Sequence, residues 1–315
     1  MSIQIAQVIR TGTGTTGVRR PAKGRLRRGS VPYLFLAPFA TLFAIFFIVP
    51  ILYAFKLSLF TTQVRRAIGH STETSSFDPF ANYHKAFTDS DFLSGVRNML
   101  TFGIVQVPVM LGLALLFALL LDSPYVRLKA LFRLSFFVPF AIPGVVAALI
   151  WGYFYTPSLS PISGLASNFN FFQPAGHLLA SVGNIVTWEW AGYNMVILVA
   201  ALQSVPGEIY EAASLDGCGP LRTALFIKIP MLRAALILTT IFSIIGTLQL
   251  FNEFSVFNVG QLTAVDTAIT PNYYAWHQAF DLQNFNYAAT ISFALAIVTF
   301  VFSIGFLTLS NREGN

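Results

Sequence analysis

Long apolar stretches alternate with short polar segments over most of the chain. Each stretch exceeds the about 20 residues that a helix needs to cross a bilayer, and each contains few charged positions. The six stretches cover residues 33–57, 98–121, 134–155, 179–203, 233–254 and 287–309. The pattern predicts an all-α, polytopic membrane protein with six transmembrane helices in one domain, residues 32–310.

The composition agrees with a membrane protein. Hydrophobic residues make up 55% of the chain and charged residues only 10%, whereas soluble proteins carry about 25% charged residues. The single cysteine, Cys218, excludes an internal disulfide. Because the first apolar stretch follows a leader of about 30 residues and lacks a small-x-small cleavage pattern, we expect a membrane span and not a signal peptide.

The basic residues predict the orientation of the spans. Lys and Arg are concentrated in the leader, after the second span and before the fifth, whereas the outer segments 156–178 and 255–286 contain neither. Cytoplasmic loops of membrane proteins carry such an excess of basic residues. With an even number of spans, both termini are expected in the cytoplasm, and the chain is expected in the cell (inner) membrane.

The sequence also predicts the character of the two polar ends and of the outer loops. Residues 1–31 lack an apolar pattern and are expected to form a disordered, basic cytoplasmic leader, with anionic-lipid attraction as an alternative role for its charge. Residues 311–315 form a cytoplasmic tail, and the aromatic-rich outer segment 60–96 forms a small cap. The four histidines are scattered, so the sequence predicts no metal site.

The polar break at residues 204–232, between the fourth and fifth spans, has a distinctive local pattern. Pro206 suits the first turn of a helix, and Glu208 and Glu211 lie early, where the helix dipole favours negative charge. Gly217 follows where helices often end in a left-handed residue. We therefore expect a short helix, a tight turn and a second helical run over 220–229.

The first of these helices has a small apolar face. Ile209, Ala212 and Ala213 share this face at i, i+3 and i+4. Another protein could therefore approach its backbone closely, and a plain amphipathic connector at the lipid surface is the alternative. The position of the pattern on the basic side, just before the penultimate span, favours a docking surface.

The full pattern consists of Glu211-Ala-Ala, three residues, Gly217, nine residues and Ile227-Lys-Ile-Pro230. It resembles the cytoplasmic coupling loop of permease subunits in binding-protein-dependent ABC importers of the carbohydrate, maltose-transporter-like class. In that family, the Glu and Gly seat a short helix in a groove of the ATPase subunit. The resemblance assigns this docking role to Glu208, Glu211, Ala212, Ala213, Asp216, Gly217, Ile227 and Pro230.

The resemblance also implies a type I ABC importer permease fold and a set of partners. These are a second homologous permease, two cytoplasmic ABC ATPases, an extracellular or lipid-anchored solute-binding protein, a sugar and membrane lipid, with no nucleic acid. The chain has no Gly-x4-Gly-Lys-Ser/Thr phosphate-binding motif. ATP and Mg are therefore expected in the partner ATPase, and this chain is expected to bind no cofactor and to be no enzyme.

Polar residues inside the fourth and fifth spans are candidates for a substrate pathway, because such residues are costly in a membrane. Hydroxyl and amide groups beside aromatic rings suit a sugar. The candidates are Trp188, Glu189, Tyr193, Asn194, Ser243, Thr247, Gln249, Asn252 and Glu253. Helix–helix hydrogen bonding is the alternative for the Ser and Thr residues, an interfacial belt for Trp188, and helix capping for Asn252 and Glu253.

The sequence thus predicts half of the translocation pathway of an ATP-driven sugar importer. A glycerol phosphodiester, a polyamine or an amino acid is the alternative cargo. Spans two to six contain no central Lys or Arg, which favours a neutral solute. A self-contained secondary carrier is the other alternative, but the inverted repeats of many carriers are not found in the sequence.

Overall fold

The computed structural model describes residues 31–67, 70–161, 164 and 169–312. It divides into two units, which meet between Leu52 and Tyr53. Apart from Val31, the predicted leader lies outside the described residues, as do the last three residues of the predicted tail.

The described part of the first unit, residues 31–52, is one apolar helical segment. It contains α1 (Val31–Phe43), the π-helical turn η1 (Ala44–Ile48) and the beginning of α2 (Val49–Ser58). Phe39, Phe43 and Phe47 form a ladder on one face, with ring centroids 5.9 and 5.2 Å apart. The large apolar side chains of this segment are exposed, so lipid or another helix has to cover them.

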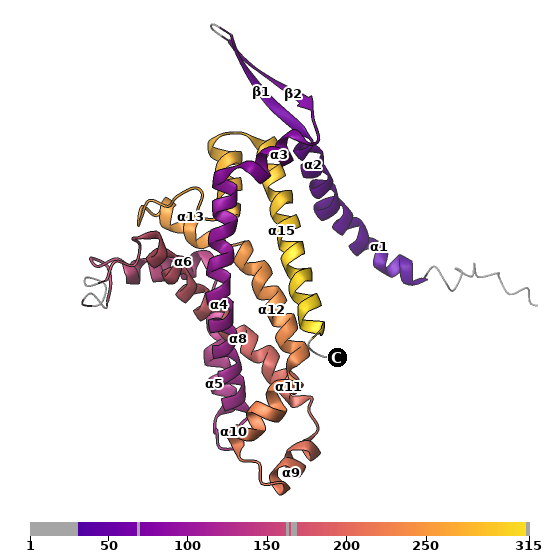
Figure 1. Ribbon diagram of the computed structural model, residues 1–315, viewed down its shortest axis with the longest axis vertical. Coiled ribbons are helices and arrows are strands. Elements are labelled where there is room, and N and C mark those ends of the chain that lie inside the picture. The colour runs from indigo at the N-terminus through magenta and orange to yellow at the C-terminus, as the bar shows by residue number, and fades with distance from the viewer. Residues whose placement is uncertain (1–30, 68–69, 162–163, 165–168, 313–315) are drawn as a thin grey trace, which may run out of the picture. The chain divides into compact units, whose positions relative to one another are not determined.

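The second unit contains the other membrane-spanning helices (Figure 1). They are α4 (Ser90–Asp122), α8 (Ala175–Gln203), α12 (Arg233–Leu248) continued by α13 (Asn252–Val259), and α15 (Phe285–Arg312). Over the described part of the chain, five helices are long and apolar enough to cross a membrane, or six if one bent pair counts as a span. This agrees with the six predicted spans.

The bent pair replaces the single helix predicted over residues 134–155. It consists of α5 (Lys129–Phe137), the 3₁₀ turn η2 (Val138–Ala141) and α6 (Gly144–Tyr155), and its two arms meet at 95°. Pro143 lacks a backbone N–H and disfavours a helical conformation in the residue before it. Ile142 is accordingly extended, with φ −81° and ψ 129°. The prolines therefore break this span and do not merely bend it.

The connection from α8 to α12 lies at one end of the second unit (Figure 1). It contains α9 (Gly207–Leu215), α10 (Pro220–Thr223), the π-helical turn η3 (Ala224–Lys228) and α11 (Ile229–Met231). The N–H of Ile229 donates to the carbonyl of Ala224, five residues back. This wide turn accommodates Pro230, whose ring would clash with the carbonyl four residues earlier in a regular α-helix.

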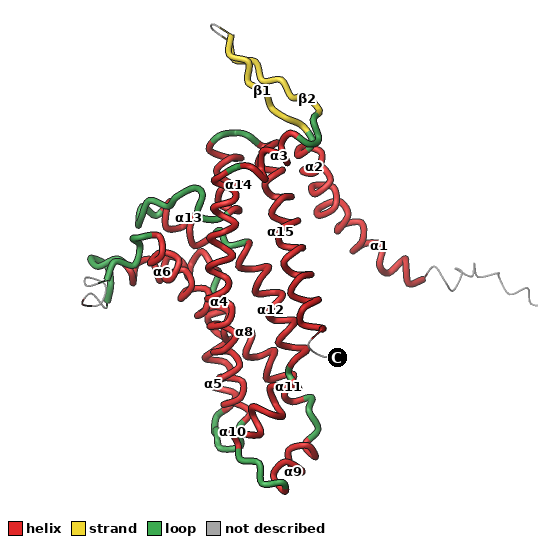
Figure 2. Tube along the Cα trace, viewed as in Figure 1, coloured by secondary structure: helices red, strands yellow, loops and turns green. Residues whose placement is uncertain are grey.

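The opposite end contains the only strands among the described residues (Figure 2). β1 (Phe60–Ala67) pairs antiparallel with β2 (His70–Phe77), and Phe60 lies opposite Phe77. The expectation of a small cap at residues 60–96 did not include this hairpin. The segment is rich in Thr and other residues that favour strands, so the hairpin is an addition to the all-α prediction.

Helices α3 (Ala81–Thr88), α14 (Pro271–Trp276) and the π-helical turn η4 (His277–Asp281) lie at this same end. Asp89, the N-cap of α4, accepts hydrogen bonds from the hydroxyls of Tyr274 and Tyr287. Burial alone would raise the pKa of Asp89, but these bonds and those from the backbone N–H groups of Asp91 and Phe92 outweigh it and lower the pKa. The carboxylate thereby links α4 to α14 and α15.

A close backbone approach holds the bent span against α8. A Cβ atom built on Gly192 would lie 1.7 Å from the carbonyl oxygen of Phe136. Small residues at helix contacts in membranes allow such approaches. Only glycine at position 192 therefore permits this packing.

We expect Gly192→Ala to displace the bent span, because a backbone carbonyl cannot move aside as a flexible side chain can. Overpacking typically costs about 1–3 kcal/mol. The measurement is the yield and thermal midpoint of the purified protein in detergent. Gly112→Ala is the control, because a Cβ at Gly112 meets nothing within 4 Å. Equal midpoints for the two variants would contradict this packing.

Candidate functional site

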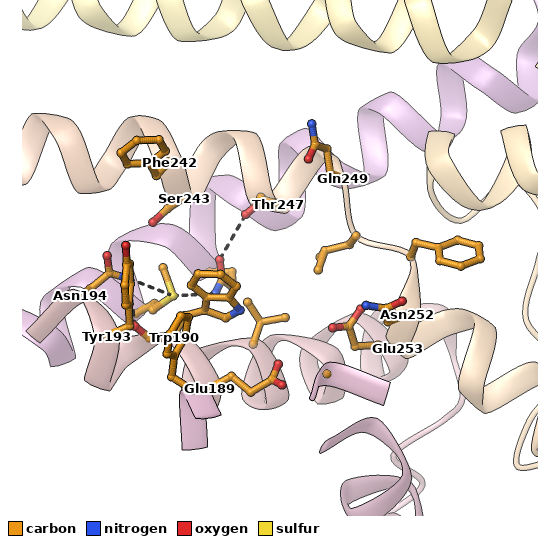
Figure 3. Close-up of a pocket in the computed structure, with 18 of the residues that line it drawn as sticks. Glu189, Trp190, Tyr193, Asn194, Phe242, Ser243, Thr247, Gln249, Asn252 and Glu253 are labelled. Atoms are coloured by element: carbon orange, nitrogen blue, oxygen red, sulfur yellow. Dashed lines mark hydrogen bonds between the residues drawn. The ribbon is translucent and has the colours of Figure 1, made fainter. Parts of the chain in front are cut away.

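A cavity of about 690 Å³ opens between α4, the bend of the third span, α8, α12 and α13 (Figure 3). This volume lies within the range of about 300–1,000 Å³ typical of small-molecule sites. All of these segments belong to the second unit. The cavity is the main candidate for a solute site in the described part of the chain.

Most of the predicted pathway residues line this cavity. They are Glu189, Tyr193, Asn194, Ser243, Thr247, Gln249, Asn252 and Glu253. The exception is Trp188, which is not part of the lining and packs edge-on against Trp151, with ring centroids 5.7 Å apart. Each helical residue is rotated by about 100° from the one before it, so Trp188 faces the protein core while Glu189 faces the cavity.

Other lining residues were not predicted. They are Gln106, Met110, Phe140, Ile142, Pro143, Gly144, Val186, Trp190, Phe242, Gly246, Leu250, Phe251 and Asn272. Gln106 had a usable signal in the sequence, because it is a polar residue in the middle of an apolar span. The residues of the bend had none, since the direction of the two arms is a property of the folded chain.

A polar network crosses the cavity wall. The hydroxyl of Thr247 donates to Oε1 of Gln106 at 3.5 Å, which joins α12 to α4. The amide of Gln106 contacts the sulfur of Met110 at 3.5 Å, and the amide of Asn194 contacts the same sulfur at 3.9 Å. Figure 3 shows Asn194 and Thr247 beside the same space. Thr247 therefore serves in helix–helix bonding and in the cavity lining at once.

Aromatic rings form one side of the cavity. Phe140, from the bend, stacks on Tyr193 with ring centroids 4.5 Å apart and meets Trp190 edge-on at 5.2 Å. Trp190 and Tyr193 are themselves in edge contact at 5.7 Å. Such flat apolar surfaces beside hydroxyls and amides suit a ligand with apolar faces and polar edges.

Two carboxyl groups face the cavity from neighbouring helices. Glu189 and Glu253 are only 5% and 6% exposed, and Oε2 of Glu253 has no hydrogen-bond partner within the described structure. A Cβ at Gly144 would lie 3.7 Å from Oε1 of Glu189, so this glycine leaves room beside the carboxyl. The described lining contains no Lys, Arg or His.

The alternative of helix capping for Asn252 and Glu253 receives no support. Phe251 is the N-cap of α13, and no side chain makes a capping hydrogen bond there. A buried carboxyl with an unpaired oxygen needs a donor. A ligand hydroxyl or amine in the cavity can supply one.

The loop at residues 204–232 forms the predicted short helix, tight turn and second helical run. The N–H of Cys218 donates to the carbonyl of Ala213 at 2.9 Å, and the N–H of Gly217 donates to that of Ser214 at 3.1 Å. These two bonds define a Schellman motif, which requires a left-handed residue after the helix. Gly217 occupies that position with φ +75°, so the expectation for this glycine is confirmed.

The exposed face of α9 differs from the predicted face. Ala213 is buried, and Ile209 is half-buried. The same chain therefore covers this face, and the ammonium group of Lys228 lies over the ring of Tyr210 in α9, 5.0 Å from its centroid. One exposed face of α9 and its turn consists of Glu208, Glu211, Ala212, Leu215 and Asp216. Ile227 is half-buried and Pro230 exposed.

Comparison with known proteins independently supports the family resemblance that the sequence pattern indicates. The family model described as "Binding-protein-dependent transport system inner membrane component" matches residues 110–312. The lactose transport system permease protein LacF of Rhizobium radiobacter is 33% identical over 283 residues, which cover 86% of this chain and 91% of that protein. The arabinooligosaccharides transport system permease protein AraP of Bacillus subtilis is 30% identical and covers 89% of this chain and 88% of its own.

Solved structures share the fold. One is a chain of a bacterial ABC transporter involved in the import of the acidic polysaccharide alginate, with a TM-score of 0.72, 18% identity and coverage of 90% of this chain and 96% of that chain. A second is the alginate transporter in complex with an alginate pentasaccharide-bound periplasmic protein, with a TM-score of 0.71 and 18% identity. It covers 91% of this chain and 96% of that chain.

Proposed function

Because the chain belongs to the family of inner membrane components of binding-protein-dependent transport systems, we propose that it forms half of the translocation pathway of an ATP-driven sugar importer. Members of this family are ABC transporter permease subunits, so the chain is not itself an enzyme. The observation that carries the proposal is the cavity, in which eight predicted pathway residues meet an aromatic wall. A secondary carrier is disfavoured by the family.

The chemistry of the cavity supports a neutral, hydroxyl-rich cargo. Stacked rings contact the apolar faces of a sugar, while Ser243, Asn194 and the two carboxyl groups accept or donate hydrogen bonds to its hydroxyls. An anionic solute would meet Glu189 and Glu253 with no basic group in the described lining. A relative named as an sn-glycerol-3-phosphate permease is 28% identical, but the acidic lining argues against a phosphate cargo here.

ATP is hydrolysed in the proposed assembly by a partner that docks on residues 204–232. Glu211 and Gly217 seat α9 in that partner, and the exposed residues around them complete the contact. ATP and Mg belong to two ATPase subunits, whereas this chain binds neither. A second homologous permease supplies the other half of the pathway, and an extracellular or lipid-anchored binding protein delivers the sugar.

The orientation of the chain follows from this docking. Residues 204–232 face the cytoplasm, together with both termini, and the β1–β2 hairpin lies on the outer side. The distribution of Lys and Arg supports this topology.

The first test is isolation of the tagged protein in mild detergent from its own host. We expect a second permease and an ATPase at stoichiometric amounts, as identified by mass spectrometry of the intact complex. The binding protein that accompanies it then identifies cargo candidates. A lone chain that moves solute into liposomes without ATP would overturn the proposal.

The second test concerns the cavity wall. Ser243→Val together with Thr247→Val removes two hydroxyls from the lining, and each hydrogen bond is worth about 1 kcal/mol. We expect the KM for sugar uptake to rise roughly tenfold or more, measured with labelled sugar in proteoliposomes that contain the whole complex. Thr239→Val is the control, because the hydroxyl of Thr239 bonds only to its own helix backbone and does not reach the cavity. Unchanged KM in the double variant would exclude this wall from the pathway.

The third test concerns the turn after α9. Gly217→Val places a β-branched residue at φ +75°, a conformation that such residues rarely adopt. We expect loss of ATP-dependent uptake, or loss of the ATPase from the purified complex. Gly219→Val is the matched control, since Gly219 is equally unobstructed but has φ −70°. If Gly217→Val transports like the parent protein, the docking role of this turn is wrong.

A further inference from the structure

A lysine connects the loop at residues 204–232, called the docking loop from here on, to α4, the second span. Lys228 is the last residue of η3 and forms an ion pair and hydrogen bond with Oδ2 of Asp122, the last residue of α4. Its ammonium group also lies over the ring of Tyr210, 5.0 Å from the centroid. The end of α4 and two segments of the loop at residues 204–232, α9 and η3, therefore meet at one side chain.

The ion pair between Lys228 and Asp122 is partly shielded from solvent. The side chains of Lys228 and Asp122 are only 15% and 22% exposed, so water and salt screen their attraction less than on an open surface. Asp122 lies at the C-terminal end of α4, where the helix dipole disfavours a negative charge. Lys228 offsets this cost, and the ammonium of Lys129 approaches the carbonyl of Asp122 at 3.4 Å.

Tyr210 contacts Lys228 through its aromatic ring, and its hydroxyl takes no part in the contact. The hydroxyl oxygen is buried and has no hydrogen-bond partner in the described structure. Burial, followed by the negative charge of Asp122, raises the pKa of Tyr210. The ring lies beside the ion pair, and its negative face attracts the ammonium group of Lys228.

The two helices that Lys228 holds near α4 have different roles. Helix α9 presents the docking residues, whereas η3 and α11 continue into α12, which lines the cavity with Ser243 and Thr247. Helix α4 lines the cavity with Gln106, 16 residues before Asp122. At 1.5 Å per residue this is about 24 Å along α4, a continuous helix that contains Pro108. A displacement of Asp122 would therefore reach the cavity wall.

We propose that Lys228 is a positioning residue that clasps α9 to the end of α4 through Asp122 and Tyr210, so that α4 moves with the docking loop. This role rests on the proposed function, because it requires a partner that pushes the loop. Without the clasp, α9 would still dock but would turn independently of α4. ATP hydrolysis would then continue while less sugar is moved for each ATP.

The test uses the complete complex in lipid nanodiscs and proteoliposomes. Every protein carries Cys218→Ser, which removes the one native cysteine of this chain, and Ser214→Cys, an exposed position on α9 outside the face proposed to contact the ATPase. A spin label on this cysteine reports the motion of α9. Sugar uptake and ATP hydrolysis by the same preparations give the number of sugars moved per ATP.

Five substitutions separate the parts of the clasp. Lys228→Met and Asp122→Asn remove the ion pair, whereas Lys228→Arg keeps a cation for both partners. Tyr210→Leu removes the ring, whereas Tyr210→Phe removes only the unpartnered hydroxyl. Arg222→Met is the control for loss of a positive charge, because Arg222 is an exposed residue of the same loop.

We expect Lys228→Met, Asp122→Asn and Tyr210→Leu to speed the motion of the label at least twofold and to lower the sugar moved per ATP at least threefold. Lys228→Arg, Tyr210→Phe and Arg222→Met should resemble the parent protein in both measurements. This pattern separates a positioning role from general destabilisation, which would also reduce the amount of assembled complex.

Two results would overturn the proposal directly. Unchanged label motion in Lys228→Met would show that the clasp does not hold α9. Faster motion with unchanged sugar per ATP would show that the clasp does not serve coupling. Failure of the proposed function is distinguishable from both, because the parent complex itself would then show no ATP-dependent uptake, and the coupling role of Lys228 would fall with it.

Discussion

Every backbone N–H and C=O group inside a bilayer must find a partner within the protein, and this requirement governs the whole structure. Continuous helices meet it in α4, α8, α12 and α15. The third span does not, because Pro139 and Pro143 interrupt it and its two arms diverge by 95°. Irregular backbone at membrane depth is tolerated where it lines a cavity. The candidate solute cavity lies at this bend, between Phe140 and Gly144 and the helices around them.

The same requirement explains why polar side chains gather there. Glu189 and Glu253 would be costly against lipid, yet both are buried within the helix bundle and line the cavity. Gly192 lets the bend approach α8 closely, and Gly144 leaves space beside Glu189. The carboxyls, amides and rings thus form one surface that is suited to an uncharged polyhydroxylated solute.

Helices α4 and α12 each extend between the cavity and the loop at residues 204–232. Helix α4 extends from the cavity wall to Asp122, and α12 extends from Thr247 back to Arg233, whose guanidinium bonds to the carbonyl of Ser310 in α15. Lys228 connects the loop to the first of these helices. A movement imposed on α9 therefore has a direct physical route to the residues that line the cavity.

The sequence by itself determined the spans, the side that carries the basic residues and the turn after α9, because hydrophobic length, charge distribution and a left-handed glycine are local properties. It also selected eight of the cavity-lining residues, since polar groups in apolar spans are rare. Tertiary structure alone decided the direction of the bend, the burial of Ala213 and the position of Trp188 in the core and not in the cavity. These features depend on which segments pack together, and no local pattern encodes the partner of a helix face.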